Sequence, residues 1–211
     1  MLDTKSVREF ISELGSNSPV PGGGSVAALS SSLASALSSM VFNLTVGKKA
    51  YNSLSEEEKA QVNSSLEITS NLKDEFLDLM NEDTVAFNSV MEAFKLPKET
   101  EEEKAIRSEK IQEGYKVAIA VPLEVAKRTF NLYEHILVAV KYGNKNAISD
   151  GGVAALMAQS AIEGAILNVR INLSGLKDEE YKKAIESQIN ILSVKGLEKQ
   201  KEILNIVNEN L

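Results

Sequence analysis

The sequence predicts an all-α protein, a bundle of long and mostly antiparallel helices. Helix-favouring residues such as Ala and Leu are plentiful, whereas Trp is absent and aromatic residues make up only 5% of the chain. Apolar side chains recur every three or four residues through long segments, which is the period of an amphipathic helix. Only four prolines interrupt the chain. We therefore expect helices with short connections, which makes consecutive helices antiparallel neighbours.

Length and composition predict one helical domain over residues 1–211, because a chain of this size can bury a sizeable core. The net charge of −7 and the pI near 5.0 argue against nucleic acid as a partner. The chain has no Cys and a single histidine, His135, so thiolate and His-rich metal sites are excluded. We therefore expect no metal.

The beginning of the chain does not resemble a signal peptide, because no basic region is followed by an apolar stretch in Met1–Lys5. No charged residue occurs from Leu14 to Gly47, and an uncharged stretch of this length is also found in membrane-spanning helices. The same stretch carries many Ser residues, which suit a helix packed within a protein better than one facing lipid. We expect a cytoplasmic protein with no membrane span.

The first predicted helix covers residues 4–14 and is stopped by Gly15, after which residues 16–24 form a loop. Ser25 is then a plausible N-cap for a second helix that reaches Val46. Its larger apolar residues are separated by Ala and Ser, which let neighbouring backbones approach closely. We expect this helix to lie at the centre of the bundle.

Two capping boxes open the next helices. Ser55 with Glu58 starts a helix that extends to about Phe94, and Thr100 with Glu103 starts another. The apolar period of this latter helix continues through Pro122, which predicts a proline-kinked helix or two helices that meet there.

The later part of the chain predicts two more helices. Gly143 and Asn144 end the preceding helix, and Ser149 or Asp150 caps a second small-residue helix that reaches about Leu173. A final helix begins at Asp178 and continues to the C-terminus. The two small-residue helices offer more close-packing surface than one chain covers, so we expect a homodimer.

Asp83 is the most unusual residue of the sequence. It lies on the apolar stripe of its helix, three residues after Met80 and four before Phe87. An unpaired carboxylate in that position is costly, and burial raises its pKa. Asp83 is therefore either a catalytic residue or a structural one that pairs with an ion or a helix terminus.

Three further groups of residues are candidates for a binding site. Gly22, Gly23, Gly24 and Ser25 stand at a predicted helix N-terminus, which attracts an anion or a polar carbonyl, although a tight turn explains them too. Lys48 and Lys49 follow the uncharged helix and either complement its dipole or bind an anion. Asn168 and Asn172 share a small-residue face and either bond across a helix pair or line a cleft. His135 fits a satisfied structural histidine better than a catalyst.

Several motifs, in this order, resemble the cyclodeaminase domain of formimidoyltransferase-cyclodeaminase and the free-standing methenyltetrahydrofolate cyclohydrolases. The resemblance covers nearly the whole chain and rests on Pro19–Ala28, Leu44–Lys49, Asp83 with Ala86-Phe87, Lys95–Lys98, Ala120–Leu123, Gly143-Asn144, Ser149-Asp150 and Asn168–Asn172.

The resemblance implies a helical homodimer that acts on a folate and needs no metal or redox cofactor. It implies that the glycine loop, the lysine pair and the Asp and Asn positions, Asn144 among them, shape the folate site. The chain has no formimidoyltransferase domain, which favours hydrolysis of 5,10-methenyltetrahydrofolate over deamination of formiminotetrahydrofolate. A non-catalytic helical dimerisation scaffold is the alternative from another class.

The chemistry of the expected substrate assigns roles to these residues. Methenyltetrahydrofolate carries a cationic amidinium carbon, to which water adds before one C–N bond breaks. A carboxylate stabilises the cation and accepts the proton of the water, and Asp83 is the first candidate for this role, with Asp150 second. Lys48 or Lys49 would bind the glutamate carboxylates of the folate, and backbone N–H groups at Gly22–Ser25 would hold the pterin or a carboxylate.

Overall fold

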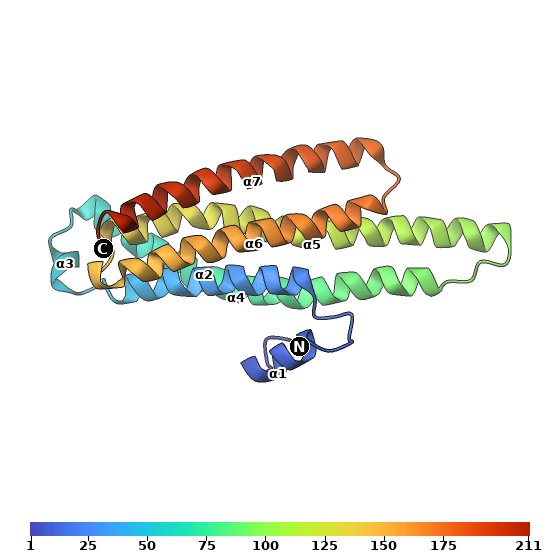
Figure 1. The fold of residues 1–211 in the computed structure, drawn as a ribbon, viewed down its shortest axis with the longest axis horizontal. Helices are drawn as coiled ribbons and strands as arrows, with labels where there is room; N and C mark the ends of the chain where they lie inside the picture. Colours follow the sequence, from blue (N-terminus) through green and yellow to red (C-terminus); the bar gives the residue numbers. More distant parts are fainter.

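The computed structural model describes residues 1–211, and its regular elements are all helical (Figure 1). These elements are α1 (Val7–Leu14), α2 (Gly23–Asn43), α3 (Lys49–Asn52), α4 (Glu56–Lys95), α5 (Glu101–Tyr142), the 3-10 helix η1 (Lys145–Ala147), α6 (Ile148–Ser174) and α7 (Glu179–Asn208). The all-α prediction is confirmed.

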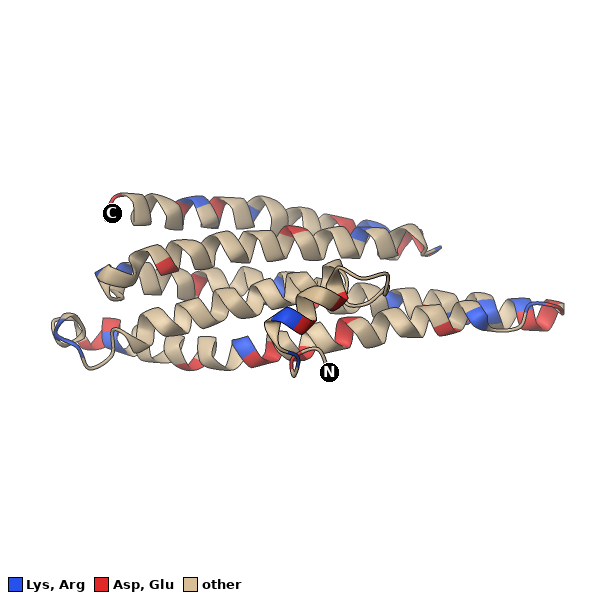
Figure 2. Cartoon of the chain, turned by 60° about the horizontal axis from the view of Figure 1, so that its bottom comes forward, with Lys and Arg blue, Asp and Glu red and all other residues tan.

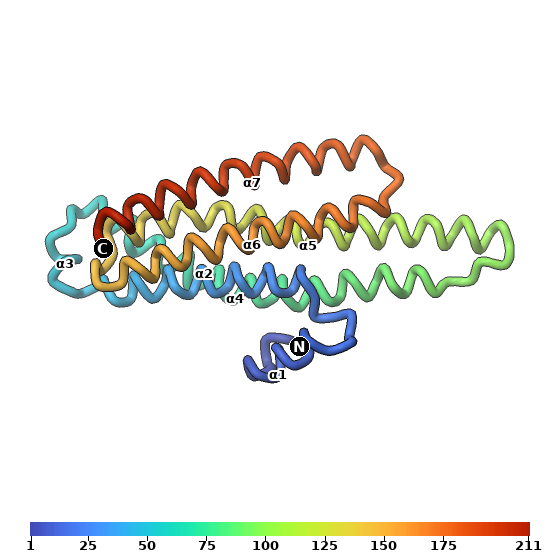
Figure 3. The backbone as a smooth tube through the Cα atoms, viewed as in Figure 1, coloured from blue at the N-terminus to red at the C-terminus, as the bar shows by residue number.

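Four long helices, α2, α4, α5 and α6, form the body of the bundle, and α7 packs against α5 and α6. The tube in Figure 3 shows that α4 and α5 form a hairpin that extends beyond the ends of α2 and α6. The core consists mainly of aliphatic side chains contributed by these five helices, with Phe76, Leu132, Ile162 and Ile189 fully buried. Each helix is therefore held by its neighbours along most of its length.

The hydroxyl groups of α2 are satisfied inside the bundle. The Ser35 hydroxyl donates to the Thr69 carbonyl at 2.8 Å, and the Ser39 hydroxyl donates to the Thr69 hydroxyl at 2.9 Å. The Ser31 and Thr129 hydroxyls are 2.6 Å apart. By length and composition, α2 and the η1–α6 segment are apolar enough to cross a membrane, but more than half of each apolar stretch is buried in the bundle. Close packing with α4 and α5 accounts for their low charge.

The predicted capping boxes at Ser55 and Thr100 are both present, with the expected reciprocal bonds to Glu58 and Glu103. Helix α5 continues without a break through Pro122, so the alternative of two separate helices is wrong. A kink at that proline stays a prediction.

Four predicted helix boundaries are wrong. Helix α1 begins at Val7 rather than at residue 4, because a turn precedes Ser6, which caps it. Helix α2 begins at Gly23 with Gly22 as its N-cap, so Ser25 lies in its first turn and does not cap it. The same helix ends at Asn43, and Lys48 precedes the short α3, so the lysine pair is not at the C-terminus of α2. Helix α6 begins at Ile148 directly after η1, which leaves Asp150 in its first turn without a capping role. In each case a turn or a 3-10 helix, which side-chain patterns encode weakly, shifts the boundary.

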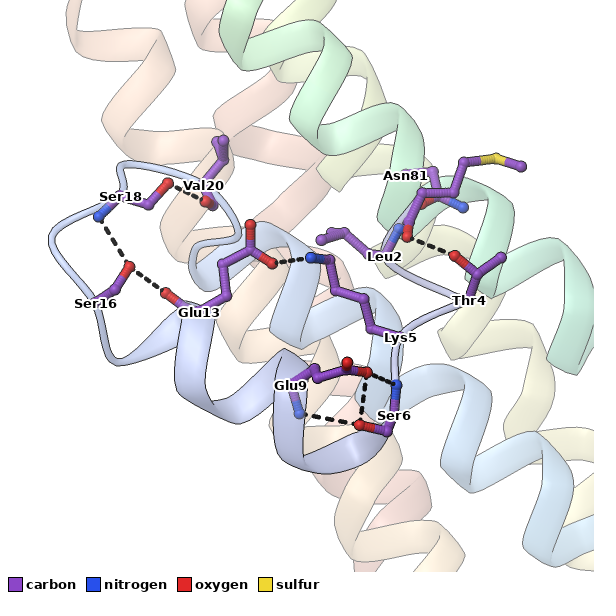
Figure 4. Close-up of polar contacts among 11 residues, drawn as sticks. Leu2, Thr4, Lys5, Ser6, Glu9, Glu13, Ser16, Ser18, Val20 and Asn81 are labelled. Carbon is purple, nitrogen blue, oxygen red and sulfur yellow. Dashed lines mark hydrogen bonds and ion pairs between the residues drawn. The ribbon is translucent and has the colours of Figure 1, made fainter.

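The N-terminal segment is fastened to α4 (Figure 4). The backbone N–H of Leu2 donates to Asn81 Oδ1 at 2.7 Å, and Asn81 Nδ2 donates to Asp3 at 2.8 Å. Ser6 caps α1 through a capping box with Glu9, and Lys5 pairs with Glu13 at 2.6 Å. The loop that follows α1 brings the chain back to the first turn of α2.

Candidate functional site

A pocket of about 400 Å³ lies at the N-terminus of α2, and we call it the α2 pocket. It is bounded by α4, α5 and α6 together with the loop before α2. Its polar or small lining residues are Gly22, Gly23, Gly24, Asp83, Tyr115, Asn168, Asn172 and Ser174, and its other lining residues are Pro19, Val20, Ala86, Phe87, Val90, Met91, Phe94, Ala118 and Ile171. A volume of this size is typical of small-molecule sites, which run to roughly 300–1,000 Å³.

The Asp83 carboxylate lies against the first turn of α2. Its Oδ2 accepts a hydrogen bond from the Ser25 hydroxyl at 2.8 Å, and the backbone of Ser25 provides a second interaction. Burial raises the pKa of Asp83 above its ordinary value, although the two contacts with Ser25 act in the opposite direction. Asp83 therefore contacts a helix terminus, as the structural interpretation requires, and also lines the pocket, as the catalytic one requires.

Two glycines make these contacts possible. A Cβ on Gly24 would lie 2.1 Å from Asp83 Oδ1, so only glycine lets the carboxylate approach the α2 backbone. A Cβ on Gly23 would lie 3.1 Å from Asn168 Nδ2. These glycines thus provide room for the side chains from α4 and α6, which is a different role from the predicted anion cradle.

Asn168 and Asn172 lie one helical turn apart on α6, and both line the pocket. Asn168 Nδ2 donates to the Gly164 carbonyl at 2.8 Å. Asn172 Nδ2 donates to the carbonyls of Ala118 and Asn168, each at 2.9 Å. The two amides therefore both bond to backbone and line a cleft, which combines the two interpretations of the sequence.

The structure brings together the glycine loop, Ser25, Asp83 and the two asparagines, but it separates them from the other candidates. Lys48, Lys49, Asn144 and Asp150 lie around the opposite end of α2, which is ~30 Å away for a helix of 21 residues. Asn144 has a structural role there, because its side chain donates to the Leu44 carbonyl at 3.2 Å. Within one chain these four residues do not contribute to the α2 pocket.

The apolar wall of the pocket was not among the site residues expected from the sequence. Phe94 and Tyr115 meet edge to face, with ring centroids 6.3 Å apart, and Phe87 lies one turn after Asp83 on α4. Phe87 and Tyr115 follow the apolar period of their helices, so the pattern alone does not distinguish a pocket wall from a core. Pro19 and Val20 carried a separate signal through their place beside the glycine loop, and Ala86 and Phe87 carried one as part of the motif around Asp83.

The remaining polar groups offer no further catalytic cluster. His135 Nδ1 is 3.1 Å from the Ser65 hydroxyl, and burial lowers the pKa of this histidine, in keeping with a satisfied structural residue. The structure contains no group of three or more His, Asp or Glu side chains that could hold a metal ion. The ionisable side chains of the α2 pocket are Asp83 and Tyr115 alone.

The structure is a helical bundle with a half-buried carboxyl group at a glycine-rich helix start, and the sequence comparisons place it in one class of proteins, the cyclodeaminase-type domains. The sequence profile described as Formiminotransferase-cyclodeaminase matches residues 6–191. The chain belongs to this family.

Two curated relatives and one solved structure illustrate the similarity. A methenyltetrahydrofolate cyclohydrolase of Methylorubrum extorquens is 40% identical over 86% of this chain and 85% of its own length. The formimidoyltransferase-cyclodeaminase of Gallus gallus is 37% identical over 86% of this chain but only 33% of its own length. The crystal structure of a formiminotetrahydrofolate cyclodeaminase from Thermotoga maritima superposes with a TM-score of 0.80 and 27% identity, covering 100% of this chain and 98% of that one.

The first prediction concerns the charge of Asp83. Asp83→Asn preserves the shape of the side chain and removes the carboxylate, so we expect a folded protein whose kcat falls by at least ~10²-fold, the scale of lost acid–base catalysis.

The same variant also tests the effect of burial on Asp83. Because burial raises the pKa of Asp83, the free energy of unfolding of the wild type should fall relative to that of the variant as pH rises through that pKa. Urea unfolding at two pH values checks the fold, and normal turnover by the variant would make Asp83 purely structural.

The second prediction concerns the hydrogen bond between Ser25 and Asp83. Ser25→Ala removes a donor that stabilises the ionised carboxylate, so the pKa of Asp83 rises further. If the ionised form is the base, the acidic limb of the kcat/KM profile moves to higher pH in this variant. Ser35→Ala, which removes a buried hydroxyl elsewhere on α2, should leave the limb in place. A limb that is unchanged in Ser25→Ala would show that another group titrates.

Proposed function

We propose that the protein hydrolyses 5,10-methenyltetrahydrofolate to 10-formyltetrahydrofolate. The observation that carries the proposal is the half-buried Asp83 carboxyl group, with its raised pKa, in a pocket that has no basic side chain. Such a pocket suits a cationic or neutral ring better than an anion. The similarity over most of its length to a methenyltetrahydrofolate cyclohydrolase supports this choice.

The proposed reaction uses Asp83 twice. The ionised carboxylate stabilises the amidinium cation, and as water adds to the bridging carbon it accepts one proton of that water. The C–N5 bond of the tetrahedral adduct then breaks, and N5 takes the proton that Asp83 had accepted. The hydroxyl of the adduct loses its proton to solvent and becomes the carbonyl of the formyl group, which stays on N10, so one proton is released overall. The backbone at Gly22–Gly24 and the amides of Asn168 and Asn172 would hold the ring system in place.

This mechanism employs only side chains of the protein and water, so we propose that no metal or redox cofactor takes part. We also propose that the protein acts in the cytoplasm, where folates that carry one-carbon units are used.

A second candidate is formiminotetrahydrofolate cyclodeaminase, in which a ring nitrogen attacks the formimino carbon and ammonia leaves. The Thermotoga maritima structure, which aligns with the entire chain, favours it. Both reactions pass through a tetrahedral carbon beside Asp83, so substrate preference has to be measured. The non-catalytic scaffold is disfavoured, because a scaffold has no use for a desolvated carboxyl group in an open pocket.

A paired assay tests the function. We expect the purified protein to remove the absorbance of 5,10-methenyltetrahydrofolate faster than buffer does, without added metal or nucleotide, and we expect Asp83→Asn to lose this activity. The parallel reaction contains 5-formiminotetrahydrofolate, and released ammonia is measured. Rapid ammonia release with negligible methenyl hydrolysis would reverse the order of the two enzymes, and inactivity towards both substrates would reject both.

We further propose that the protein is a homodimer joined through the face formed by α2 and α6. The neighbouring helices leave exposed apolar side chains along this face: Leu33 and Met40 on α2, Leu44 directly after it, and Val153, Leu156, Leu167 and Ile171 on α6. Figure 2 shows long stretches of helix without charged residues between charges that are scattered along the bundle. Helix α2 itself contains no charged residue. An apolar face of this length is typical of an interface. A two-fold axis across it would bring Lys48 and Lys49 of the second copy towards the α2 pocket, where they can bind the glutamate tail.

Dimerisation and the role of the lysines are tested together. Leu167, which is 64% exposed, is replaced by Glu to place a charge in the interface, and we expect a monomer in sedimentation velocity with reduced activity. Lys48→Ala with Lys49→Ala should raise KM and leave kcat largely unchanged. The matched control is Val117→Glu, an exposed apolar position on α5 outside this face. A wild type that sediments as a monomer at micromolar concentration would contradict the dimer.

A further inference from the structure

Pro122 leaves one backbone carbonyl of α5 without its helical partner. In an α-helix the N–H of a residue donates to the carbonyl four residues earlier, and proline has no N–H. The carbonyl that Pro122 leaves free belongs to Ala118, which lines the α2 pocket. Pro122 itself is buried and does not line the pocket.

The side chain of Asn172 supplies the hydrogen-bond donor that Pro122 lacks. Its Nδ2 donates to the Ala118 carbonyl at 2.9 Å, across the interface between α5 and α6. The same nitrogen donates to the Asn168 carbonyl at 2.9 Å. An amide nitrogen has two hydrogens, so both are engaged and Oδ1 is the only group of this side chain left for a ligand. Asn172 therefore enters the pocket as an acceptor.

We propose that Pro122 is a positioning residue, and that it directs Asn172 Oδ1 to accept a hydrogen bond from an N–H donor of the bound heterocycle. The inference rests on the proposed function, because the tetrahydropterin head of a folate is rich in such donors whereas its glutamate tail offers carboxylates. The Asn172 amide cannot flip to present its N–H groups to the ligand, because both are engaged by backbone carbonyls. Its Oδ1 therefore favours the N–H-rich pterin head of the folate over the carboxylates of the tail. Mispairing would leave a buried polar group unsatisfied, which makes the selection strong.

The proposal accounts for a proline inside a long helix, where it is costly. An alanine at position 122 would supply the missing N–H and restore the intrahelical bond to Ala118. Asn172 Nδ2 would then compete with a backbone donor for the same carbonyl. The side chain would lose the contact that orients it, although the helix itself would become more regular.

The experiment combines Pro122→Ala and Asn172→Leu in a double-mutant cycle. We expect Pro122→Ala to melt at the same temperature as the wild type or higher, yet to bind tetrahydrofolate about three- to tenfold more weakly in calorimetry, the scale of one hydrogen bond. Asn172→Leu should weaken binding at least as much, and adding Pro122→Ala to it should weaken binding no further. Val117→Ala, an exposed helix-favouring change on α5 next to Ala118, is the matched control and should bind normally.

Two fragments identify the part of the ligand that Asn172 contacts. 6-Methyltetrahydropterin represents the head and p-aminobenzoylglutamate the tail. We expect inhibition by the tetrahydropterin to weaken in both variants and inhibition by the tail fragment to stay as it is in the wild type. A tail fragment that responds to the variants, or a Pro122→Ala protein that binds tetrahydrofolate normally, would overturn the inference.

The test separates the failure of this inference from that of the proposed function. A wild type that neither converts nor binds folates contradicts both proposals about the ligand. A wild type that turns over its substrate while the variants behave normally contradicts the present inference alone. The orienting contact has its own readout, because hydrogen exchange of the Asn172 side-chain amide should become faster in Pro122→Ala. Asn172→Leu tests the acceptor even if Pro122→Ala does not fold.

Discussion

The contact between the Asp83 carboxylate and the first turn of α2 is the constraint on which the rest of the site depends. It requires α2 and α4 to approach so closely that a Cβ at Gly24 would lie 2.1 Å from Asp83 Oδ1. The positive end of the α2 dipole and the Ser25 hydroxyl stabilise the ionised form, while burial favours the neutral form. Opposed effects of this kind set the proton affinity of the carboxyl group, and because burial is the larger effect here, the pKa of Asp83 lies above its ordinary value, in the direction that acid–base chemistry needs.

The charge distribution explains how an acidic protein can bind a folate. The net charge of −7 opposes an anionic ligand, but the α2 pocket has no basic side chain and is equipped with acceptors and a carboxylate. The positively charged end of methenyltetrahydrofolate is its bridged ring, and this is the end that we propose enters the pocket. The anionic tail has to find its partners elsewhere, and the lysines at the far end of α2 lie too distant in the same chain.

The hydrogen bonds of the pocket illustrate how a helical bundle builds a polar site. Helices satisfy their own backbone groups, so a bundle offers few free donors or acceptors except at helix ends and irregularities. This pocket draws on both: the start of α2, with its glycines, and the carbonyl of Ala118 that Pro122 leaves open. At both points a backbone group lacks its usual partner within the helix, and a side chain, Asp83 or Asn172, bonds there and is held in one orientation.

The sequence by itself determined the long helices of the fold and the identity of Asp83 as a singular residue, whereas the short α3 and η1 were not predicted. Apolar period and capping boxes are local properties, so the helices after Ser55 and Thr100 begin where the side chains indicate. A charge on an apolar stripe is likewise visible without coordinates, because the period of the helix tells which way Asp83 faces.

Only the tertiary structure decided which candidates share a site and what each of them does. Ser25 looked like a helix cap and is instead a hydrogen-bond donor to Asp83, since the helix begins two residues earlier. Lys48, Lys49 and Asp150 joined Asp83 in the expected site, yet the length of α2 keeps them apart within one chain. The pairing of Asn172 with Ala118 depends on how α6 docks against α5, and that register is set by packing across the whole bundle rather than by any local pattern.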